Sequence, residues 1–278
     1  MAGAKLGLIA GAGGLPVEIA DACRQVGREV HVLRLKGMAD PAIAAFPGDD
    51  VGLAELGRCV RVLRRERCQC VCFAGVVRRP DFSALAPDLG ALRHLPGILA
   101  AARGGDDGLL RAVLAAFEAE GFAVEGVGEA AAQLTLGCGA LGSVVPGAFH
   151  QSDIRKALQA ARAAGENDIG QGAIVRDGLV LVSEDHDGTD AMLRRCAEAS
   201  GLSEGALNGV LAKVPKPGQD RRVDLPTMGV ATIELAAQAG LAGVAGEAGA
   251  LLVVDREAVR RAADRLGLFV LGVDGGEA

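Results

Sequence analysis

The chain has 278 residues, of which 50% are hydrophobic, with seven Phe, no Tyr and no Trp, and a formal net charge of −6. Single-stranded nucleic acids are bound on aromatic platforms, and nucleic-acid binders generally carry basic surfaces, so this composition argues against a nucleic-acid partner. The length is sufficient for one large domain or two ordinary domains with aliphatic cores.

Cysteine usage and the absence of a long apolar run indicate a cytosolic chain. A strand pattern begins within four residues of the N-terminus, we find no signal peptide, and no run of 18 uncharged apolar residues occurs. Cys68, Cys70 and Cys72 alternate along an apolar run, so we expect them to act as small hydrophobic side chains on one strand face. A metal site is the alternative, but no fourth Cys or nearby His completes a ligand set.

The first predicted unit is a strand, a glycine-rich turn and a helix. Residues Lys5–Ala10 form the apolar strand and Gly11–Pro16 the turn. Pro16 stands where the dinucleotide fingerprint has its third glycine, and the second strand, Val30–Leu35, is followed by Lys36 rather than by an acidic residue. We therefore interpret the turn as a phosphate or ribose cradle and not as an NAD site, with a purely structural turn as the alternative.

Strands and helices continue to alternate through the first half of the chain. A helical pattern at Leu56–Arg64 precedes the strand Val71–Val77, and Asp106 opens a further helix before the strand Phe122–Val127. This alternation predicts a mostly parallel sheet with helices on both faces. The loop directly after the strand Val71–Val77 carries Arg79, and loops at the carboxyl ends of parallel strands face the ligand crevice; an ordinary solvated loop is the alternative.

The pattern changes after about Gly128, and we place a domain boundary between residues 134 and 135. The second domain is expected to open with the helix Ser152–Ala164, followed by a hairpin of Gly172–Val175 and Leu179–Val182. Asp177-Gly178 is a strong signal for the turn between these strands.

An acidic segment, residues 184–190, precedes a helix that we expect at Ala191–Cys196. Its carboxylates suit either a Mg²⁺ site or a solvated loop with a helix cap. The strand Val210–Val214 then leads into a proline-rich exit that holds Lys213 and Lys216 near the next acidic loop. Lysines beside a metal-binding carboxylate suit the neutralisation of a diphosphate, whereas the simpler alternative is solubilisation of a sheet edge.

The segment Asp220–Gly229 is the most informative part of the chain, because charged residues and strand breakers come directly before a helical pattern. We expect Thr227 to cap a helix that runs from Met228 to a stop at Gly240, with Asp224 in a solvent-facing loop just before its N-terminus. There a carboxylate is suited to hold a divalent cation that bridges to a phosphate. The alternative is a solvated loop with a charge pair.

The remaining elements complete a second α/β unit. They are a strand at 243–249, an extended segment at 251–255, a helix around 259–266 and a strand at 268–273.

With these pieces in order, the chain resembles the LpxI-type UDP-2,3-diacylglucosamine diphosphatase family of lipid A biosynthesis over essentially its whole length. The matching segments are Leu6–Gly11, Gly14–Pro16, Phe73–Gly75, Arg79–Phe82, Gly104–Asp107, Asp168–Gly172, Gly188–Leu193, Lys213, Pro215–Pro217, Arg222–Thr227, Gly229, Gly246–Gly249 and Asp255–Arg256. Residues 137–139 and 199–209 match nothing specific.

The resemblance implies an α/β fold with an N-terminal Rossmann-like domain and a C-terminal α/β catalytic domain, with the ligand between them. It further implies Mg²⁺-dependent hydrolysis to UMP and 2,3-diacylglucosamine 1-phosphate (lipid X), with water attacking the phosphorus nearer the sugar. Asp224 is the expected catalytic residue, and Asp224 and Asp190 are the expected metal ligands. The expected substrate-binding residues are Gly11, Gly13, Gly14, Leu15, Gly75, Arg79, Gln171, Thr189, Lys213, Lys216 and Arg222.

The expected partners are a lipid-linked UDP-sugar, a transient inner-membrane surface and a second copy in a homodimer. Two other classes stay open at this point. A nucleotide-sugar binding or transfer protein would use the same glycine-rich cradle without metal-dependent loss of diphosphate. A structural or regulatory Rossmann-like protein would bind neither UDP nor Mg²⁺.

Overall fold

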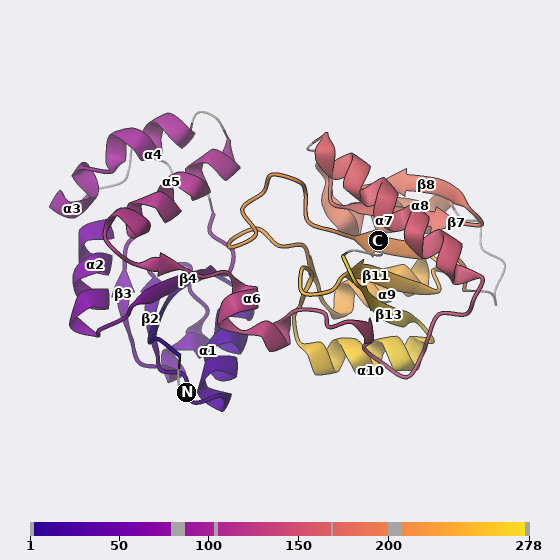
Figure 1. The fold of residues 1–278 in the computed structure, drawn as a ribbon, viewed down its shortest axis with the longest axis horizontal. Coiled ribbons are helices and arrows are strands. Elements are labelled where there is room, and N and C mark those ends of the chain that lie inside the picture. The colour runs from indigo at the N-terminus through magenta and orange to yellow at the C-terminus, as the bar shows by residue number, and fades with distance from the viewer. Residues whose placement is uncertain (1–2, 79–86, 103–104, 168, 200–206, 276–278) are drawn as a thin grey trace. The chain divides into compact units, whose positions relative to one another are not determined.

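The computed structural model describes residues 3–78, 87–102, 105–167, 169–199 and 207–275 (Figure 1). The chain divides into two compact units, Met1–Ala132 and Gln133–Ala278. Each unit has its own sheet, so each is described by itself. The α/β fold with a parallel sheet in the first unit and a second α/β unit is the one expected.

The N-terminal unit contains a five-stranded sheet in the order β3-β2-β1-β4-β5, and all of its strand pairs are parallel. The strands are β1 (Leu6–Ala10), β2 (Val30–Leu35), β3 (Gly48–Val51), β4 (Cys70–Ala74) and β5 (Ala123–Val124). The helices are α1 (Leu15–Gln25), η1 (Pro41–Ala45), α2 (Leu56–Arg65), α3 (Leu89–Leu92), α4 (Leu95–Ala102), α5 (Asp106–Ala119) and α6 (Val127–Ala130). The strand order reverses between β1 and β4, where doubly wound folds bind ligands.

Two strands of this sheet are shorter than expected. The run predicted as Val71–Val77 forms a strand only to Ala74, because Gly75 takes the left-handed conformation (φ +88°) and turns the chain. The run Phe122–Val127 yields the two-residue β5, and Val127 already belongs to α6. Strand β3 was not expected, since its sequence Gly-Asp-Asp-Val lacks an apolar pattern.

A partly buried ion pair between Arg28 and Glu125 connects three strands of the N-terminal sheet. The guanidinium group of Arg28 donates two hydrogen bonds to the Glu125 carboxylate, at 2.8 and 2.9 Å, and their side chains are 10% and 23% exposed. The same group donates to the Cys70 sulfur and the Ala4 carbonyl. Arg28 therefore ties the start of β1 to β4 and to the residue after β5.

Six of the seven cysteines are buried, and all seven are free thiols; Cys138 is the exposed one. Burial raises the pKa of Cys68 to about 11 and those of Cys70 and Cys72 to about 12. The prediction that these three pack as small buried side chains is confirmed. The described residues contain no group of three or more His, Cys, Asp and Glu placed to hold a metal ion.

The C-terminal unit contains a six-stranded mixed sheet in the order β6-β13-β11-β9-β7-β8. Its strands are β6 (Gly139–Ala140), β7 (Gly172–Arg176), β8 (Leu179–Ser183), β9 (Val210–Lys213), β11 (Gly243–Glu247) and β13 (Phe269–Val273). β9, β11 and β13 are parallel, and β7 runs antiparallel to β9. The helices are α7 (His150–Glu166), α8 (Gly188–Ala199), α9 (Val230–Gln238) and α10 (Arg256–Leu266), and the turn η3 (Ala132–Leu134) precedes the sheet.

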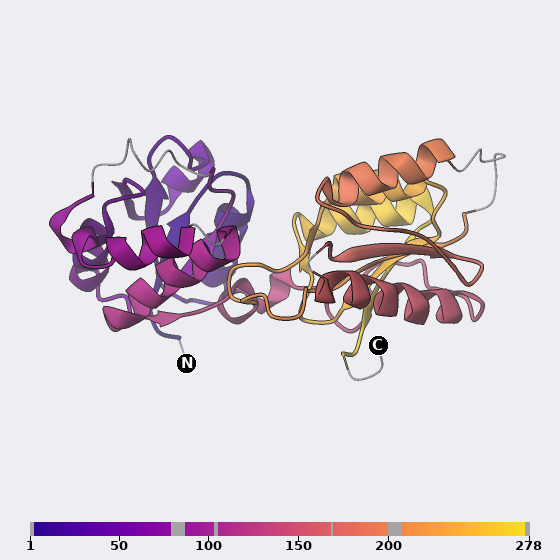
Figure 2. The ribbon, with the colours of Figure 1, turned by 90° about the horizontal axis from the view of Figure 1, so that it is seen from above.

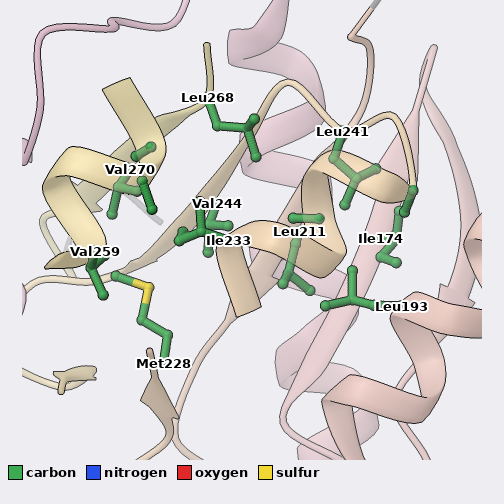
Figure 3. Packing of buried hydrophobic residues seen from close by; sticks show 14 of the residues in the cluster. Ile174, Leu193, Leu211, Met228, Ile233, Leu241, Val244, Val259, Leu268 and Val270 are labelled. Atoms are coloured by element: carbon green, nitrogen blue, oxygen red, sulfur yellow. The ribbon is translucent and has the colours of Figure 1, made fainter. Parts of the chain in front are cut away.

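Alternation along the strands builds one core on each face of this sheet. Ile174, Leu211, Val244 and Val270 point to the face covered by α8, α9 and α10 (Figure 3). Their strand neighbours, among them Val175, Val210, Ala245 and Phe269, point to the face covered by α7. Figure 2 shows α7 on one side of the sheet and α8 with α10 on the other. Helices on both faces explain why these strands are apolar on both sides.

The hairpin of the C-terminal unit forms as predicted. Strands β7 and β8 pair antiparallel, and the turn residues Asp177 and Gly178 have positive φ values of 51° and 74°. These values are those that a two-residue turn of the twisted hairpin type demands.

The segment after Asp224 differs from the prediction. Thr227 and Met228 form a short strand, β10, which pairs in parallel with β12 (Leu252–Val253), and the helix α9 begins at Val230. The prediction that Thr227 caps this helix is therefore wrong. The N-cap is Gly229, whose backbone nitrogen lies 3.5 Å from the Thr232 hydroxyl, while the helix ends near the left-handed Gly240 as expected. Among the described residues, no helix is both long enough and apolar enough to cross a membrane.

Candidate functional site

The C-terminal unit gathers polar residues at one edge of its sheet. Strand β9 ends there at Lys213, and β7 begins there at Gly172, because the two strands are antiparallel and pair Gly172 with Lys213. Gln171 lies beside this pair, with its carbonyl accepting a hydrogen bond from Val214 at 2.9 Å. The parallel strand β11 ends at the same edge with Glu247. Carboxyl ends of parallel strands are the usual ligand edge of α/β sheets.

Lys213 is a buried lysine, with 4% of its surface exposed. Its ammonium group donates to the backbone carbonyl of Thr227 at 2.8 Å. Burial lowers the pKa of Lys213, and the nearby Glu184 and Asp190 carboxylates act in the opposite direction. Lysines are almost never so deeply buried unless they have a partner. At this polar edge the ammonium group of Lys213 is suited to bind a phosphate.

Glu184 and Thr189 form a buried pair in the acidic segment. Glu184 is 6% exposed and follows β8, and its Oε2 accepts a hydrogen bond from the Thr189 hydroxyl at 3.0 Å. A side chain on Gly172 would place a Cβ 2.6 Å from this Oε2 atom, and one on Gly170 would meet the Glu184 carbonyl oxygen at 2.3 Å. These two glycines therefore make the space that the Glu184 residue occupies.

The other acidic residues of this segment are on the surface. Arg195 pairs with Asp185 at 2.7 Å and with Asp187 at 3.0 Å. Asp190 is exposed and lies 4.0 Å from Arg194, one turn further along α8. The helix begins at Gly188 rather than at Ala191, so Thr189 and Asp190 belong to its first turn. Asp185 and Asp187, two of the four carboxylates, thus form the solvated loop that the sequence offered as the alternative to a Mg²⁺ site.

Asp224 lies in a compact turn that Asp220 organises. The Asp220 carboxylate accepts hydrogen bonds from the backbone and the guanidinium of Arg222, at 2.6–3.1 Å, and the Asp220 carbonyl accepts from the Asp224 backbone nitrogen at 3.1 Å. Gln219 donates its side-chain amide to Asp224 Oδ2 at 2.7 Å. Asp224 is half-buried, and β10 separates it from α9. The expectation that Asp224 lies directly before a helix N-terminus is therefore wrong, and its side chain is partly rather than fully exposed.

Two glutamine oxygens near this edge are buried without a hydrogen-bond partner among the described residues. They are Gln219 Oε1, on the amide that contacts Asp224, and Gln171 Oε1, beside the β7–β9 pair. A buried carbonyl oxygen without a donor is costly, and such an atom commonly marks a place where a water, an ion or a ligand binds. Each of these amide oxygens can coordinate a hard cation such as Mg²⁺, or can accept a hydrogen bond from an N–H or O–H group of a substrate.

The residues fit a magnesium ion by their donor chemistry. Mg²⁺ is usually held by one or two carboxylates together with substrate phosphates and waters, so a cluster of three acidic residues is not required. Asp224 with the unpartnered oxygen of Gln219 supplies two such donors. The sharing of one cation by Asp224 and Asp190 stays a prediction.

The glycine-rich turn of the N-terminal unit lies at the point where the strand order reverses. Ala12 and Val76 exchange backbone hydrogen bonds at 2.9 Å, which binds the loop after β1 to the loop after β4. A Cβ at Gly11 would come within 2.7 Å of the Val76 oxygen, and one at Gly75 within 2.6 Å of the Ala12 oxygen. Close backbone packing therefore accounts for these two glycines without a ligand.

Gly13, Gly14 and Leu15 are placed differently. Gly13 has φ +89° and no atom within 4 Å of the position a Cβ would take, and Gly14 is the N-cap of α1 without a side-chain hydrogen bond. The first N–H groups of a helix have no partner within the helix, and Gly13 leaves open space beside this helix start, so the phosphate cradle stays a prediction. Leu15 is half-buried as the first residue of the helix.

Comparison with known proteins gives the family. The LpxI N-terminal domain family matches residues 5–134, and the LpxI C-terminal domain family matches residues 137–271. A curated relative from Caulobacter vibrioides, named UDP-2,3-diacylglucosamine pyrophosphatase LpxI, is 59% identical over 273 residues, which cover 97% of this chain and 98% of the relative. The chain belongs to the LpxI family.

The structure brings together several, not all, of the residues expected to form the site of this LpxI family member. Gln171 and Lys213 lie side by side at the sheet edge, and Thr189 is linked to the same edge through Glu184. Arg222 is engaged by Asp220, and Lys216 lies half-buried in the turn after β9. The binding and catalytic roles of all these residues stay predictions.

One expected residue lies outside the described part of the chain, and one residue near the sheet edge was not expected. Arg79 belongs to residues 79–86, which the structure does not describe. Gln219 was missed, because a glutamine in a polar turn looks like a surface residue in a sequence. Glu184 was expected as one carboxylate of the acidic segment, suited to Mg²⁺ or to a solvated loop, and its burial was not foreseen. The signal available was Gly170 and Gly172, two glycines close together at the start of a strand, which indicate a close approach by another residue.

Proposed function

We propose that this chain hydrolyses the diphosphate of UDP-2,3-diacylglucosamine, with Mg²⁺, to give UMP and 2,3-diacylglucosamine 1-phosphate in lipid A biosynthesis. The observation that carries the proposal is the full-length match to the LpxI family, with a relative named for this pyrophosphatase activity. The C-terminal edge supports it, because its carboxylates, lysines and carbonyl oxygens suit a diphosphate and a hard cation.

The proposed roles follow from the contacts. Gln219 donates a hydrogen bond to Asp224 and thereby orients this carboxylate, whose proposed role is to act on the cation or on the attacking water. A Mg²⁺ ion held by Asp224 and Gln219 would neutralise phosphate charge and would lower the pKa of the attacking water. Lys213 provides a fixed positive charge toward the phosphates, and its hydrogen bond to the Thr227 carbonyl fixes its direction.

The reaction requires no covalent nucleophile on this chain. Water adds to the phosphorus nearer the sugar, the bond from that phosphorus to the bridging oxygen breaks, and UMP leaves with the bridging oxygen. In such transfers the protein acts mainly by positioning and by electrostatic stabilisation. Carboxylates and cations are what this sheet edge offers.

The experiment is incubation of the purified protein with the UDP-linked diacyl sugar, with and without Mg²⁺, while UMP is measured. The matched variant is Asp224→Asn, which keeps an acceptor for Gln219 and removes the charge. We expect kcat to fall by about 100-fold or more, the usual loss for one electrostatic contact in the transition state. Asp50→Asn, at a carboxylate of the N-terminal unit that is 63% exposed, is the control and should retain full activity.

Failure of the wild-type protein to form UMP would refute the proposal. Binding of the nucleotide sugar without Mg²⁺-dependent hydrolysis would favour the binding or transfer protein instead. An Asp224→Asn variant with near-normal kcat would leave the activity standing and remove Asp224 from its mechanism.

A further inference from the structure

Glu184 occupies a position that an acidic residue rarely takes. It is 6% exposed, and glutamates are almost never so deeply buried unless they are paired. The chain accommodates Glu184 because residues 170 and 172 are glycines. A Cβ atom at either position would collide with the Glu184 backbone or carboxylate. Its backbone nitrogen also donates to the Gly172 carbonyl at 2.8 Å, which fixes the residue at the start of β7.

The contact with Thr189 has a defined direction. The hydroxyl of Thr189 donates the 3.0 Å hydrogen bond, and Glu184 Oε2 accepts it. A hydroxyl has a single proton, and this one is used by Glu184. Thr189 Oγ1 therefore has only lone pairs to offer to another group, and it accepts from a substrate O–H or N–H, or binds a cation, rather than donating to a phosphate.

The buried Lys213 points to the same face of the sheet as the Glu184 carboxylate, because Lys213 pairs directly with Gly172, where a Cβ would come within 2.6 Å of Glu184 Oε2. Burial lowers the pKa of this lysine, and the two carboxylates that act against burial are Glu184, after β8, and Asp190, on the first turn of α8. Asp190 is exposed and paired with Arg194, so solvent screens its effect. Glu184 is buried, and its charge acts on Lys213 with much less screening.

We propose that Glu184 is a positioning residue that keeps Lys213 in its ammonium form and turns the Thr189 hydroxyl into an acceptor toward the substrate. This inference rests on the proposed function for its kinetic consequences, while its effect on Lys213 stands independently. Glu184 itself does not touch the substrate in this scheme. It acts through two residues of the same sheet edge, one a cation for phosphate and the other an oxygen acceptor.

The test is Glu184→Gln, which keeps size and hydrogen-bonding groups and removes the charge. Proteins with ¹⁵N- and ¹³C-labelled lysine allow the Lys213 side chain to be titrated by NMR, with its signal assigned through Lys213→Met. We expect the midpoint of the Lys213 titration to move down by about one pH unit in the variant, the lower end of the shift caused by a nearby opposite charge. Glu198→Gln, at an exposed glutamate of the same helix that holds Thr189, is the control and should leave the midpoint unchanged.

Kinetics provide the second readout. In Glu184→Gln the alkaline limb of the kcat/KM profile should move to lower pH together with the Lys213 midpoint, because the neutral lysine no longer attracts phosphate. Thr189→Val should raise KM, whereas Thr189→Ser, which keeps the hydroxyl, should stay near the wild-type value. If Glu184→Gln does not fold, Thr189→Val still tests the role given to the hydroxyl.

The outcomes separate this inference from the proposed function. A Lys213 midpoint that does not move in folded Glu184→Gln overturns the inference, whatever the enzyme does. An unchanged KM in Thr189→Val overturns the role given to the hydroxyl. Absence of UMP formation by the wild-type protein refutes the proposed function, and the NMR titration then still decides whether Glu184 holds the charge of Lys213.

Discussion

Gln219 is the residue whose removal tests how Asp224 is held. Gln219→Ala deletes the amide that donates to Asp224 Oδ2 at 2.7 Å. A hydrogen bond to a charged group contributes about 1.5–3 kcal/mol. If the transition state requires Asp224 in this orientation, the loss corresponds to about a 10- to 150-fold fall in kcat/KM, since each 1.4 kcal/mol is about tenfold.

Stability should change much less than activity in this variant. The same substitution removes Gln219 Oε1, a buried oxygen without a partner among the described residues. Leaving such an atom unsatisfied costs about 1–3 kcal/mol, so its removal offsets most of the lost hydrogen bond. We expect a change of about 1 kcal/mol or less in the free energy of unfolding.

The assay pairs initial rates of UMP formation with urea unfolding followed by circular dichroism. Gln151→Ala, at an exposed glutamine on α7, is the control and should match the wild-type protein in both measurements. Gln219→Glu should be less active than Gln219→Ala, because it places a second negative charge against Asp224. A Gln219→Ala variant with kcat/KM within about threefold of wild type refutes the reasoning, since a loss that small is under about 0.7 kcal/mol.

Two further predictions concern stability. Glu125→Ala should lower the free energy of unfolding by about 3–5 kcal/mol in urea titrations, because it leaves the partly buried Arg28 without its carboxylate partner; a loss below about 1 kcal/mol would mean that the pair behaves as a surface contact. Burial raises the pKa of Glu125, but the hydrogen bonds from Arg28 outweigh this and lower it overall, so the pair's stabilisation should be present above pH 4.5 and lost as the pH falls through the lowered pKa. His150, whose Nδ1 accepts from the Gly147 nitrogen while Nε2 is buried without a partner, has its pKa lowered by burial. The melting temperature of the wild-type protein should therefore fall as the pH drops from 7.5 to 5.5, and His150→Asn should flatten this dependence; parallel curves for the two proteins would contradict it.

The sequence predicted the elements whose side chains repeat with a clear period. Strand β2 has the predicted bounds, Val30–Leu35, and the hairpin turn at Asp177-Gly178 is as expected, because apolar runs and positive-φ turn residues are local properties. The two-residue strand β10 and the polar strand β3 were missed. Neither is long or apolar enough to show a period, and each forms because a neighbouring strand provides the pairing.

The site was predictable in its composition and not in its arrangement. Lys213 and Gln171 were expected from the resemblance, but the antiparallel pairing that places them side by side depends on the tertiary fold. The sequence offered Glu184 as one carboxylate of a segment suited either to Mg²⁺ or to a solvated loop, and its burial follows from contacts with Gly170, Gly172 and Thr189. The sequence does not distinguish the buried Glu184 from its neighbour Asp185, which lies on the surface and pairs with Arg195.

The burial of six cysteines has a practical consequence for spectroscopy. Maleimides and nitroxide reagents react with the thiolate, and Cys59, Cys70 and Cys72, with pKa values raised to about 12, carry almost none at neutral pH. Cys138, just before β6, is the exposed thiol. Fluorophores or spin labels should therefore attach to the native protein at that position, so the C-terminal unit can carry a reporter without any cysteine being replaced.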